Sequence, residues 1–147
     1  MVVSFACDHG GLELKNAIIA HAKEKGFEVK DFGTYTKDSC DYPDFARQCA
    51  ECVAKGESDF GVVVCTTGIG VSIVANKVDG VRCALCHTPF EAEMTRRHNN
   101  SNVIAFGQKA VSEEAAIEMF DIFTSMEFEG GRHQRRVDKI TEIEKTR

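Results

Sequence analysis

The sequence predicts a single α/β domain, residues 1–147, built on a doubly wound sheet of five parallel strands. The first observation is that short apolar runs alternate with amphipathic segments of helical length, which is typical of βαβ units. The second is that glycine-containing turns follow two of the apolar runs, as they do where a strand passes into a helix. A chain of 147 residues is long enough to bury one hydrophobic core.

The first half of the chain alternates strand and helix twice. The apolar run 2–7 predicts a strand that ends at the polar glycine turn Asp8-His9-Gly10-Gly11. A helix follows from about residue 14, and Lys25-Gly26 gives it a basic last turn and a glycine stop. Residues 27–32 alternate as a second strand, and the next helix opens at Asp41-Tyr42-Pro43-Asp44, where proline is tolerated in the first turn.

The central stretch, residues 62–77, combines the end of an apolar strand, a glycine turn and the start of a helix. The strand is predicted over 60–64, and the turn carries Cys65, Thr66 and Thr67. A fourth strand is expected over 81–86. Such a turn gathers backbone N–H groups and a positive helix end at the mouth of a parallel sheet, where an anion can bind.

The last part of the chain contains three further helix signals. Thr88-Pro89-Phe90-Glu91 is a capping box with proline at the first helical position, and that helix is expected to end at Arg96-Arg97. His98 to Asn102 is predicted to be a polar turn before a strand over 103–106. Ser112 caps the next helix, and after Gly130-Gly131 a narrow apolar stripe predicts an extended, amphipathic C-terminal helix.

Composition excludes several classes of partner. The net charge of −5 gives no global attraction to nucleic acid or to an anionic membrane, and no apolar run approaches the ~20 residues of a membrane span. The N-terminus lacks the pattern of a signal peptide, so the seven cysteines are expected to be reduced thiols in the cytoplasm. Two CxxC pairs, Cys49/Cys52 and Cys83/Cys86, are poor zinc ligands because they fall on a helix face and along a strand rather than in knuckle turns.

The Cys65 turn is the leading candidate for chemistry. In a parallel α/β sheet, ligands bind at the carboxyl ends of the strands, where Asp8-His9-Gly10-Gly11 and Cys65 both fall. A cysteine beside a helix N-terminus loses its proton readily. The turn is not a dinucleotide fingerprint, because the third glycine position is Ile73, and no lysine follows in register for a P-loop. A general anion hole of backbone N–H groups remains.

Basic and imidazole side chains elsewhere suggest a phosphorylated substrate. His9 and His98 fall in predicted polar turns and are candidates for acid–base work or phosphate contact. Arg132 and Arg136 are four residues apart on one helix face, a spacing that suits one phosphate. No metal or redox cofactor motif is present. Chemistry that needs only proton movement fits best, namely isomerisation through an enediolate held in the anion hole.

Five motifs resemble the ribose/galactose isomerase family over essentially the whole chain. They are Ala6-Cys7-Asp8-His9-Gly10-Gly11, Asp41-Tyr42-Pro43, Cys65-Thr66-Thr67-Gly68-Ile69-Gly70 with Ala75-Asn76-Lys77, Arg97-His98-Asn99-Asn100, and Gly130-Gly131-Arg132-His133-Gln134-x-Arg136. The resemblance implies a Rossmann-like three-layer αβα sandwich, and a homodimer, with a tetramer also open, whose active sites lie at the subunit interface. It implies interconversion of ribose 5-phosphate and ribulose 5-phosphate without metal or other cofactor.

The resemblance also implies roles for single residues. Cys65 is the base that moves a proton between C1 and C2, and Thr67 and His98 help to open the furanose ring. The backbone of the turn stabilises the enediolate through Thr66, Gly68, Ile69 and Gly70. The substrate-binding side chains are Asp8 for sugar hydroxyls, His9, Arg132 and Arg136 for the phosphate, Asn99 near the reacting carbons and Tyr42 along the sugar pocket.

Other functions stay open from the sequence. A hexose 6-phosphate, such as allose or galactose 6-phosphate, is an alternative substrate, because the depth of the pocket decides between the sugars and the sequence does not show it. Thr66 adds bulk beside the base where relatives often have glycine or serine, and this bulk narrows the pocket. Lys109 replaces an arginine that relatives often carry, so it is not assigned to the phosphate. A non-catalytic sugar-phosphate-binding subunit and a thiol redox protein are the other classes; the full set of Cys65, Thr67 and His98 favours an enzyme.

Overall fold

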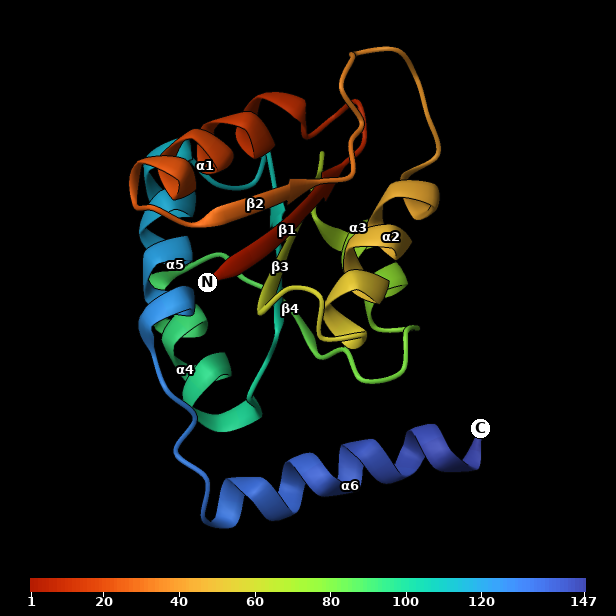
Figure 1. The fold of residues 1–147 in the computed structure, drawn as a ribbon, viewed down its shortest axis with the longest axis vertical. Coiled ribbons are helices and arrows are strands. Elements are labelled where there is room, and N and C mark those ends of the chain that lie inside the picture. The colour runs from red at the N-terminus through yellow and green to blue at the C-terminus, as the bar shows by residue number, and fades with distance from the viewer.

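The computed structural model describes all 147 residues as a three-layer αβα domain with one helix set apart (Figure 1). In chain order its elements are β1 (Val2–Cys7), α1 (Leu12–Glu24), β2 (Glu28–Asp31), α2 (Tyr42–Ala54), β3 (Phe60–Cys65), α3 (Ile69–Ala75), β4 (Cys83–Leu85), α4 (Pro89–Asn99), β5 (Val103–Gly107), α5 (Glu113–Ser125) and α6 (Arg132–Thr146).

The five strands form one parallel sheet in the order β2-β1-β3-β5-β4, which confirms the predicted fold class. Phe5 of β1 pairs with Val62 of β3, and Val62 pairs with Ile104 of β5, which sets the register of the three central strands. Because every strand runs the same way, the turns after β1 and β3 reach the same edge of the sheet. This brings the two predicted glycine turns to one end of the molecule.

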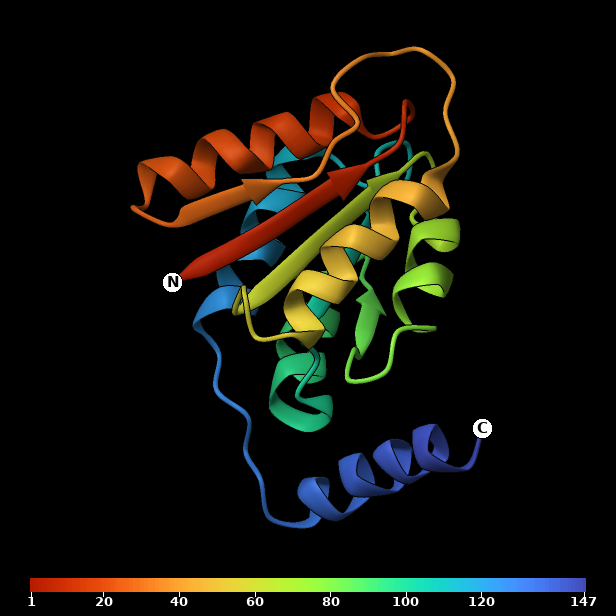
Figure 2. The same cartoon turned by 45° about the vertical axis from the view of Figure 1, so that its right-hand side comes forward.

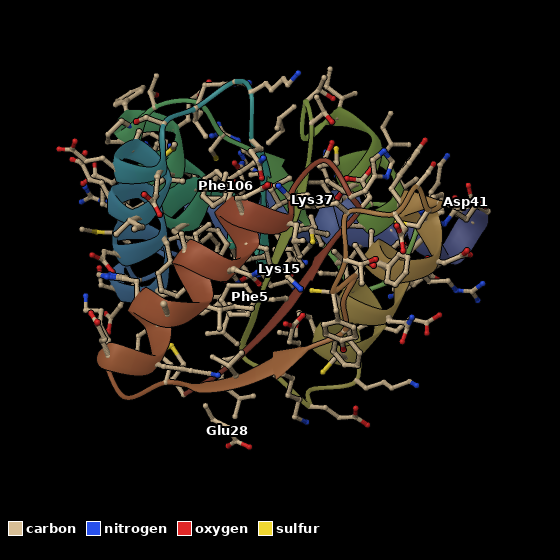
Figure 3. All side chains as sticks on the ribbon, turned by 90° about the horizontal axis from the view of Figure 1, so that it is seen from above. Phe5, Lys15, Glu28, Lys37, Asp41 and Phe106 are labelled. Atoms are coloured by element: carbon tan, nitrogen blue, oxygen red, sulfur yellow. The ribbon has the colours of Figure 1, made fainter.

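Side chains alternate across the sheet and divide the core into two layers. Val64 and Phe106 point to one face, where α1, α4 and α5 pack, whereas Val63, Cys65 and Ala105 point to the other, where α2 and α3 pack. Figure 3 labels Phe5 and Phe106 of the first layer together with Lys15 of α1. The sulfur of Cys65 therefore faces the helical layer that contains Tyr42 rather than the layer with the larger aromatic core.

One buried charge fixes the segment that follows β2. Lys15 is fully buried, and its Nζ donates to the Asp31 carboxylate at 2.7 Å and to the Thr34 carbonyl at 2.8 Å. A buried ammonium is tolerated only when paired and hydrogen-bonded. The backbone of Cys7 also pairs with Gly33 and Thr34. These contacts tie the loop before α2, which borders the Cys65 end of the sheet, to the end of β1.

Two predicted boundaries are wrong. The fourth strand is limited to Cys83–Leu85 at the sheet edge, where only β5 pairs with it. The helix over 89–97 continues through His98 and Asn99, so these residues form its last turn and not a polar loop. It ends when Asn100 adopts a left-handed conformation with φ 48°, which asparagine tolerates.

Helix α6 lies away from the sandwich, beyond the amino ends of the strands (Figures 1 and 2). Its first turn touches α4, and near its end Glu144 accepts the Gly80 N–H at 2.9 Å while Arg147 pairs with Asp79. Its apolar residues Ile140 and Ile143 are largely exposed. The extended C-terminal helix is thus present as predicted, with much of its apolar stripe uncovered by its own chain. No helix has the length and apolar character needed to cross a membrane.

Truncation of Phe106 tests the assignment of the core. Phe106 is 0% exposed and Phe90 is 69% exposed. We expect Phe106→Ala to lower the free energy of unfolding by about 3–5 kcal/mol, because it leaves a cavity between sheet and helices. Phe90→Ala, the matched control, should change it by about 0.5 kcal/mol or less. Urea unfolding at one fixed protein concentration measures both, and equal losses would contradict the assignment.

Candidate active site

The turn from Cys65 to Gly70, the Cys65 turn, depends on glycine for its shape. Gly68 has φ 78°, which L side chains rarely adopt. A β carbon there would also lie 2.6 Å from the Leu85 side chain and 2.8 Å from the Gly107 nitrogen. Only glycine allows the chain to turn this closely past β5, and the turn carries the end of β3 directly into α3.

The Cys65 turn places a backbone hydrogen-bond donor at the Cys65 sulfur. The Gly68 N–H donates to the Cys65 Sγ at 3.1 Å, and such a donor stabilises a thiolate. Three other core thiols, Cys7, Cys49 and Cys86, have no such donor from a glycine turn, and burial raises their pKa to about 12, so they stay protonated. The local geometry therefore separates Cys65 from the cysteines that only fill the core.

The Cys65 turn contacts the turn after β1, as the sequence predicts. Thr66 is exposed and lies against Gly10, where a β carbon would come within 2.1 Å of its Oγ1. Thr67 Oγ1 accepts the Ile69 N–H at 3.2 Å, which holds its side chain over the start of α3. Both threonine hydroxyls therefore lie on the turn that follows the thiol, at the carboxyl end of the sheet.

Asp8 and His9 are each oriented by one backbone N–H. The Asp8 carboxylate is buried and accepts the Gly10 N–H at 2.9 Å, which leaves its other oxygen for a further donor. His9 Nδ1 accepts the Cys40 N–H at 3.3 Å. A neutral His9 ring consequently carries its proton on Nε2 and presents a hydrogen-bond donor outward. Asp8 is thus placed to accept hydrogen bonds from sugar hydroxyls, and His9 is placed to donate one to an anionic oxygen.

Tyr42, the first residue of α2, closes the other side of the turn. A β carbon on Gly70 would lie 2.6 Å from Tyr42 Cε1, so the ring packs directly on the glycine. Tyr42 is 39% exposed, and Ile69 and Ile73 of α3 beside it are exposed as well. We call the group Asp8, His9, Tyr42 and Cys65–Gly70 the carboxyl-end half-site. Its rim is apolar and open.

The other predicted site residues lie at the opposite end of the same chain. Helix α4 returns from β4 to the start of β5 and carries His98 and Asn99 in its last turn. Arg82, directly before β4, donates to the Asn99 carbonyl at 2.9 Å. Arg132 and Arg136 belong to α6, beyond the amino ends of the strands (Figure 2). Within one chain, these residues and Cys65 are not brought together.

A second cluster, which we call the amino-end half-site, consists of His98, Asn99, Arg132, His133 and Arg136. The imidazole rings of its two histidines lie at its centre. The rings of His98 and His133 are stacked, with centroids 4.1 Å apart and planes inclined by 9°. His133 is 6% exposed, and its Nε2 has no hydrogen-bond partner. Arg132 and Arg136, on the first two turns of α6, are exposed next to this stack.

The carboxylate of Glu129 lies close to both imidazole rings. Its Oε1 lies 3.6 Å from His133 Nε2 and 3.9 Å from His98 Nε2, while its Oε2 forms an ion pair with Arg97, 2.8 Å from Nε. The sequence alone did not indicate Glu129, and it placed His133 only within the motif Gly130-Gly131-Arg132-His133-Gln134-x-Arg136. Glu129 and His133 are four residues apart, but Gly130-Gly131 between them interrupts any helical pattern, so their contact becomes evident only once α6 is seen against α4.

The three side chains have atoms within 4.8 Å of one another, a spacing that suits a metal ion. Their orientation does not suit one. A histidine binds metal along a nitrogen lone pair in the plane of its ring, and two nearly parallel, stacked rings cannot both direct that lone pair at one ion. The stack is better described as an arrangement of two imidazoles than as a metal site.

Comparison with known proteins identifies the family. Residues 3–140 match the Ribose/Galactose Isomerase family model, so the chain belongs to that family. It is 47% identical over 145 residues to ribose-5-phosphate isomerase B of Escherichia coli (strain K12), covering 99% of this chain and 97% of that protein.

Solved structures agree with this assignment. Ribose-5-phosphate isomerase B from Clostridium thermocellum is 47% identical, with a TM-score of 0.98 and 99% of each chain covered. The enzyme from Mycoplasma genitalium, solved with bound ribulose-5-phosphate, is 43% identical, with a TM-score of 0.95 over 99% of this chain and 97% of that one. The similarity is sufficient to assign this chain to a family of sugar-phosphate isomerases.

The amino-end half-site should respond to pH. Burial lowers the pKa of His133 below the usual 6.5; nearby His98 and Arg132 lower it further, with a smaller contribution from Arg136, and Glu129 opposes the shift. A lowered pKa in the folded state means that stabilisation is present above pH 6.5 and is lost as the pH falls below it. We expect the first turns of α6 to exchange amide hydrogen faster, relative to α1 peptides, as the pH falls from 7 to about 5.5.

His133→Phe is the matched control, because phenylalanine keeps a flat ring but cannot take up a proton. Hydrogen–deuterium exchange in this variant should lack the extra acceleration below pH 6.5. The same acceleration in the variant would show that another group causes it.

Proposed function

We propose that this chain is an aldose–ketose isomerase that interconverts D-ribose 5-phosphate and D-ribulose 5-phosphate, the reaction named in its relatives. The observation that supports this most directly is the thiol of Cys65, held by the Gly68 N–H in a glycine turn at the carboxyl end of the sheet. A stabilised thiolate beside a run of backbone N–H groups is what an enediolate mechanism requires.

The proposed reaction has two stages. In the first, the bond between C1 and the ring oxygen of the furanose breaks, the C1 hydroxyl loses its proton and the ring oxygen gains one; His98 and Thr67 serve this exchange. In the second, the Cys65 thiolate removes the proton from C2 of the open aldose and returns it to C1 of the enediolate, while the proton of the C2 hydroxyl passes to the C1 oxygen, so that the carbonyl moves from C1 to C2. The backbone N–H groups from Thr66 to Gly70 stabilise the oxyanion that forms between these steps.

The complete site needs two copies of the chain. The end of the protomer opposite Cys65 carries His98, Asn99, Arg132 and Arg136. One chain alone therefore cannot bring these residues and Cys65 to the same substrate molecule. A two-fold symmetric dimer pairs the carboxyl-end half-site of each chain with the amino-end half-site of its partner and makes two equivalent sites. In that dimer, the partner's side chains supply the acid and the phosphate ligands.

Exposed apolar side chains support this pairing. Tyr42, Ile69 and Ile73 border the carboxyl-end half-site, and Ile140 and Ile143 lie on the helix that carries the arginines. Contiguous exposed apolar surface on a soluble domain commonly marks an interface. A cavity of about 490 Å³ between α6 and the domain, lined in part by Ile140 and Ile143, leaves room for side chains of a second chain.

The substrate phosphate would be held by charge and by donors already in place. Arg132 and Arg136 are four residues apart on one face of α6 and lie at its N-terminal end, where the helix dipole also favours an anion. His9 adds an outward Nε2–H from the other half-site. A reducing compartment such as the cytoplasm fits this chain, since all seven cysteines are free thiols.

Removal of the thiol tests the assigned base. We expect Cys65→Ala to lower kcat on ribose 5-phosphate by about 10³-fold or more, because no other group in the turn can take the C2 proton. Binding of ribulose 5-phosphate, measured by calorimetry, should change little, since its ligands are retained. Cys52→Ala, which removes a thiol buried under α2, is the control and should keep turnover. A Cys65→Ala variant that keeps its activity would refute the thiolate base. Parallel kinetics on allose 6-phosphate tests the choice of substrate.

Mixing two inactive variants tests the composite site. Cys65→Ala and His98→Asn homodimers, unfolded together and refolded, form hybrids that hold one intact site and one doubly altered site. If exchange is random, activity should return to about a quarter of the wild-type value, because half of the dimers are hybrids with one working site of two. A site completed within one chain would give no recovery.

A further inference from the structure

His133 is buried at the junction of α4 and α6, yet the proposed reaction gives it no role. It is 6% exposed and its Nε2 has no hydrogen-bond partner. Burying an unpaired polar nitrogen costs free energy, and an apolar side chain of similar shape would avoid that cost. Its flat ring, however, covers one face of the His98 imidazole at 4.1 Å.

We propose that His133 and Glu129 are positioning residues for ring opening, which hold the His98 imidazole in the orientation that it presents to the substrate. The inference rests on the proposed function, in which His98 exchanges protons with the furanose. His133 acts through its ring, which stacks under His98, and Glu129 acts through its carboxylate, which faces both imidazoles.

The stack restricts the motion of His98. This side chain lies on the last turn of α4 and is partly exposed, and the stacked ring and the nearby carboxylate are what hold it within its own chain. A nearly parallel ring at 4.1 Å blocks rotation of the imidazole toward that side. The His98 side chain keeps 38% of its surface exposed, so the acid is oriented without being covered.

Glu129 is itself fixed to the residue that precedes His98. Its Oε2 forms an ion pair with Arg97, 2.8 Å from Nε, and its backbone N–H donates to the Arg97 carbonyl at 3.0 Å. Its Oε1 is therefore held 3.9 Å from His98 Nε2. When His98 takes the proton of the C1 hydroxyl, the positive charge forms beside this carboxylate, which stabilises it.

The same junction couples the acid to the phosphate ligands. His133 follows Arg132 directly and is three residues before Arg136 on α6. Its contact with His98 of α4 therefore sets the distance between the imidazole and the two guanidinium groups. The acid and the phosphate ligands then reach the partner's Cys65 turn as one unit rather than as independent side chains.

A proton-exchange assay separates ring opening from the chemistry of the base. Ribulose 5-phosphate cannot close a five-membered ring, because its C5 oxygen is esterified, so exchange of its C1 proton with solvent deuterium needs Cys65 but no ring opening. Conversion of ribose 5-phosphate to ribulose 5-phosphate needs both. NMR follows the exchange, and steady-state kinetics gives kcat and KM for the conversion.

We expect His133→Ala and Glu129→Gln to lower kcat for ribose 5-phosphate by about tenfold or more, with KM changed by less than about threefold. The exchange rate in ribulose 5-phosphate should stay within about twofold of wild type. His133→Phe, which keeps a stacked ring, should retain most of the conversion. Gln134→Ala, an exposed neighbour on α6, is the matched control and should match wild type in both assays.

Three results would overturn the inference. One is an equal loss of exchange and conversion in both Glu129→Gln and His133→Ala, which would indicate a purely structural effect on the dimer. Another is wild-type conversion in these variants. The third is a His133→Phe variant as impaired as His133→Ala, which would assign the role to the nitrogens and not to the stacked ring. Absence of both exchange and conversion in the wild-type protein would instead refute the proposed function.

Discussion

The uniform direction of the five strands is the constraint on which the rest of the structure depends. A parallel sheet collects the turns after β1 and β3 at one edge, and it forces each connecting helix to return to the other edge before the next strand starts. Cys65 ends a strand and His98 ends a returning helix, so the two are separated by the length of the sheet. No local change of sequence brings them together in one chain. A site that needs both must therefore be assembled from two chains, and the fold itself accounts for that requirement.

At the carboxyl end of the sheet, three glycines are as important to the shape of the site as the residues with reactive side chains. Gly10 leaves space for Thr66, Gly68 lets the turn pass Gly107, and Gly70 accepts the Tyr42 ring. Each contact would become a clash with a β carbon, so the thiol, the hydroxyls and the phenol can approach one another only with glycine at these places. Burial raises the pKa values of Cys7, Cys49 and Cys86, which fill the core away from this turn.

The sequence was sufficient to predict the parts of the fold that depend on local patterns. Alternation of apolar runs predicted the parallel sheet, and Thr88 and Ser112 predicted helix starts that the structure confirms with side-chain caps. The end of α4 was mispredicted because His98 and Asn99 look polar and loop-like, whereas the helix continues until Asn100 takes a left-handed conformation. Glu129 could not be found from pattern alone, since its contacts with Arg97 and the imidazoles exist only after α6 folds back across α4. Local signals predict elements, but contacts between distant elements depend on tertiary packing.

The amino-end cluster also explains how an outlying helix can take part in a precise reaction. Within one chain, α6 has few contacts with the domain: Val137 is buried, but Ile140 and Ile143 are exposed, and the remaining contacts are the imidazole stack at one end and those of Glu144 and Arg147 at the other. A mobile helix would place Arg132 and Arg136 poorly, and effective catalysis requires reacting groups to be held near their final geometry. The stack fixes the end of α6 that carries these arginines, and a second chain covering the apolar stripe would fix the rest. If two chains pair as proposed, the packing that covers the apolar stripe of α6 also holds Arg132 and Arg136 in position for the substrate phosphate.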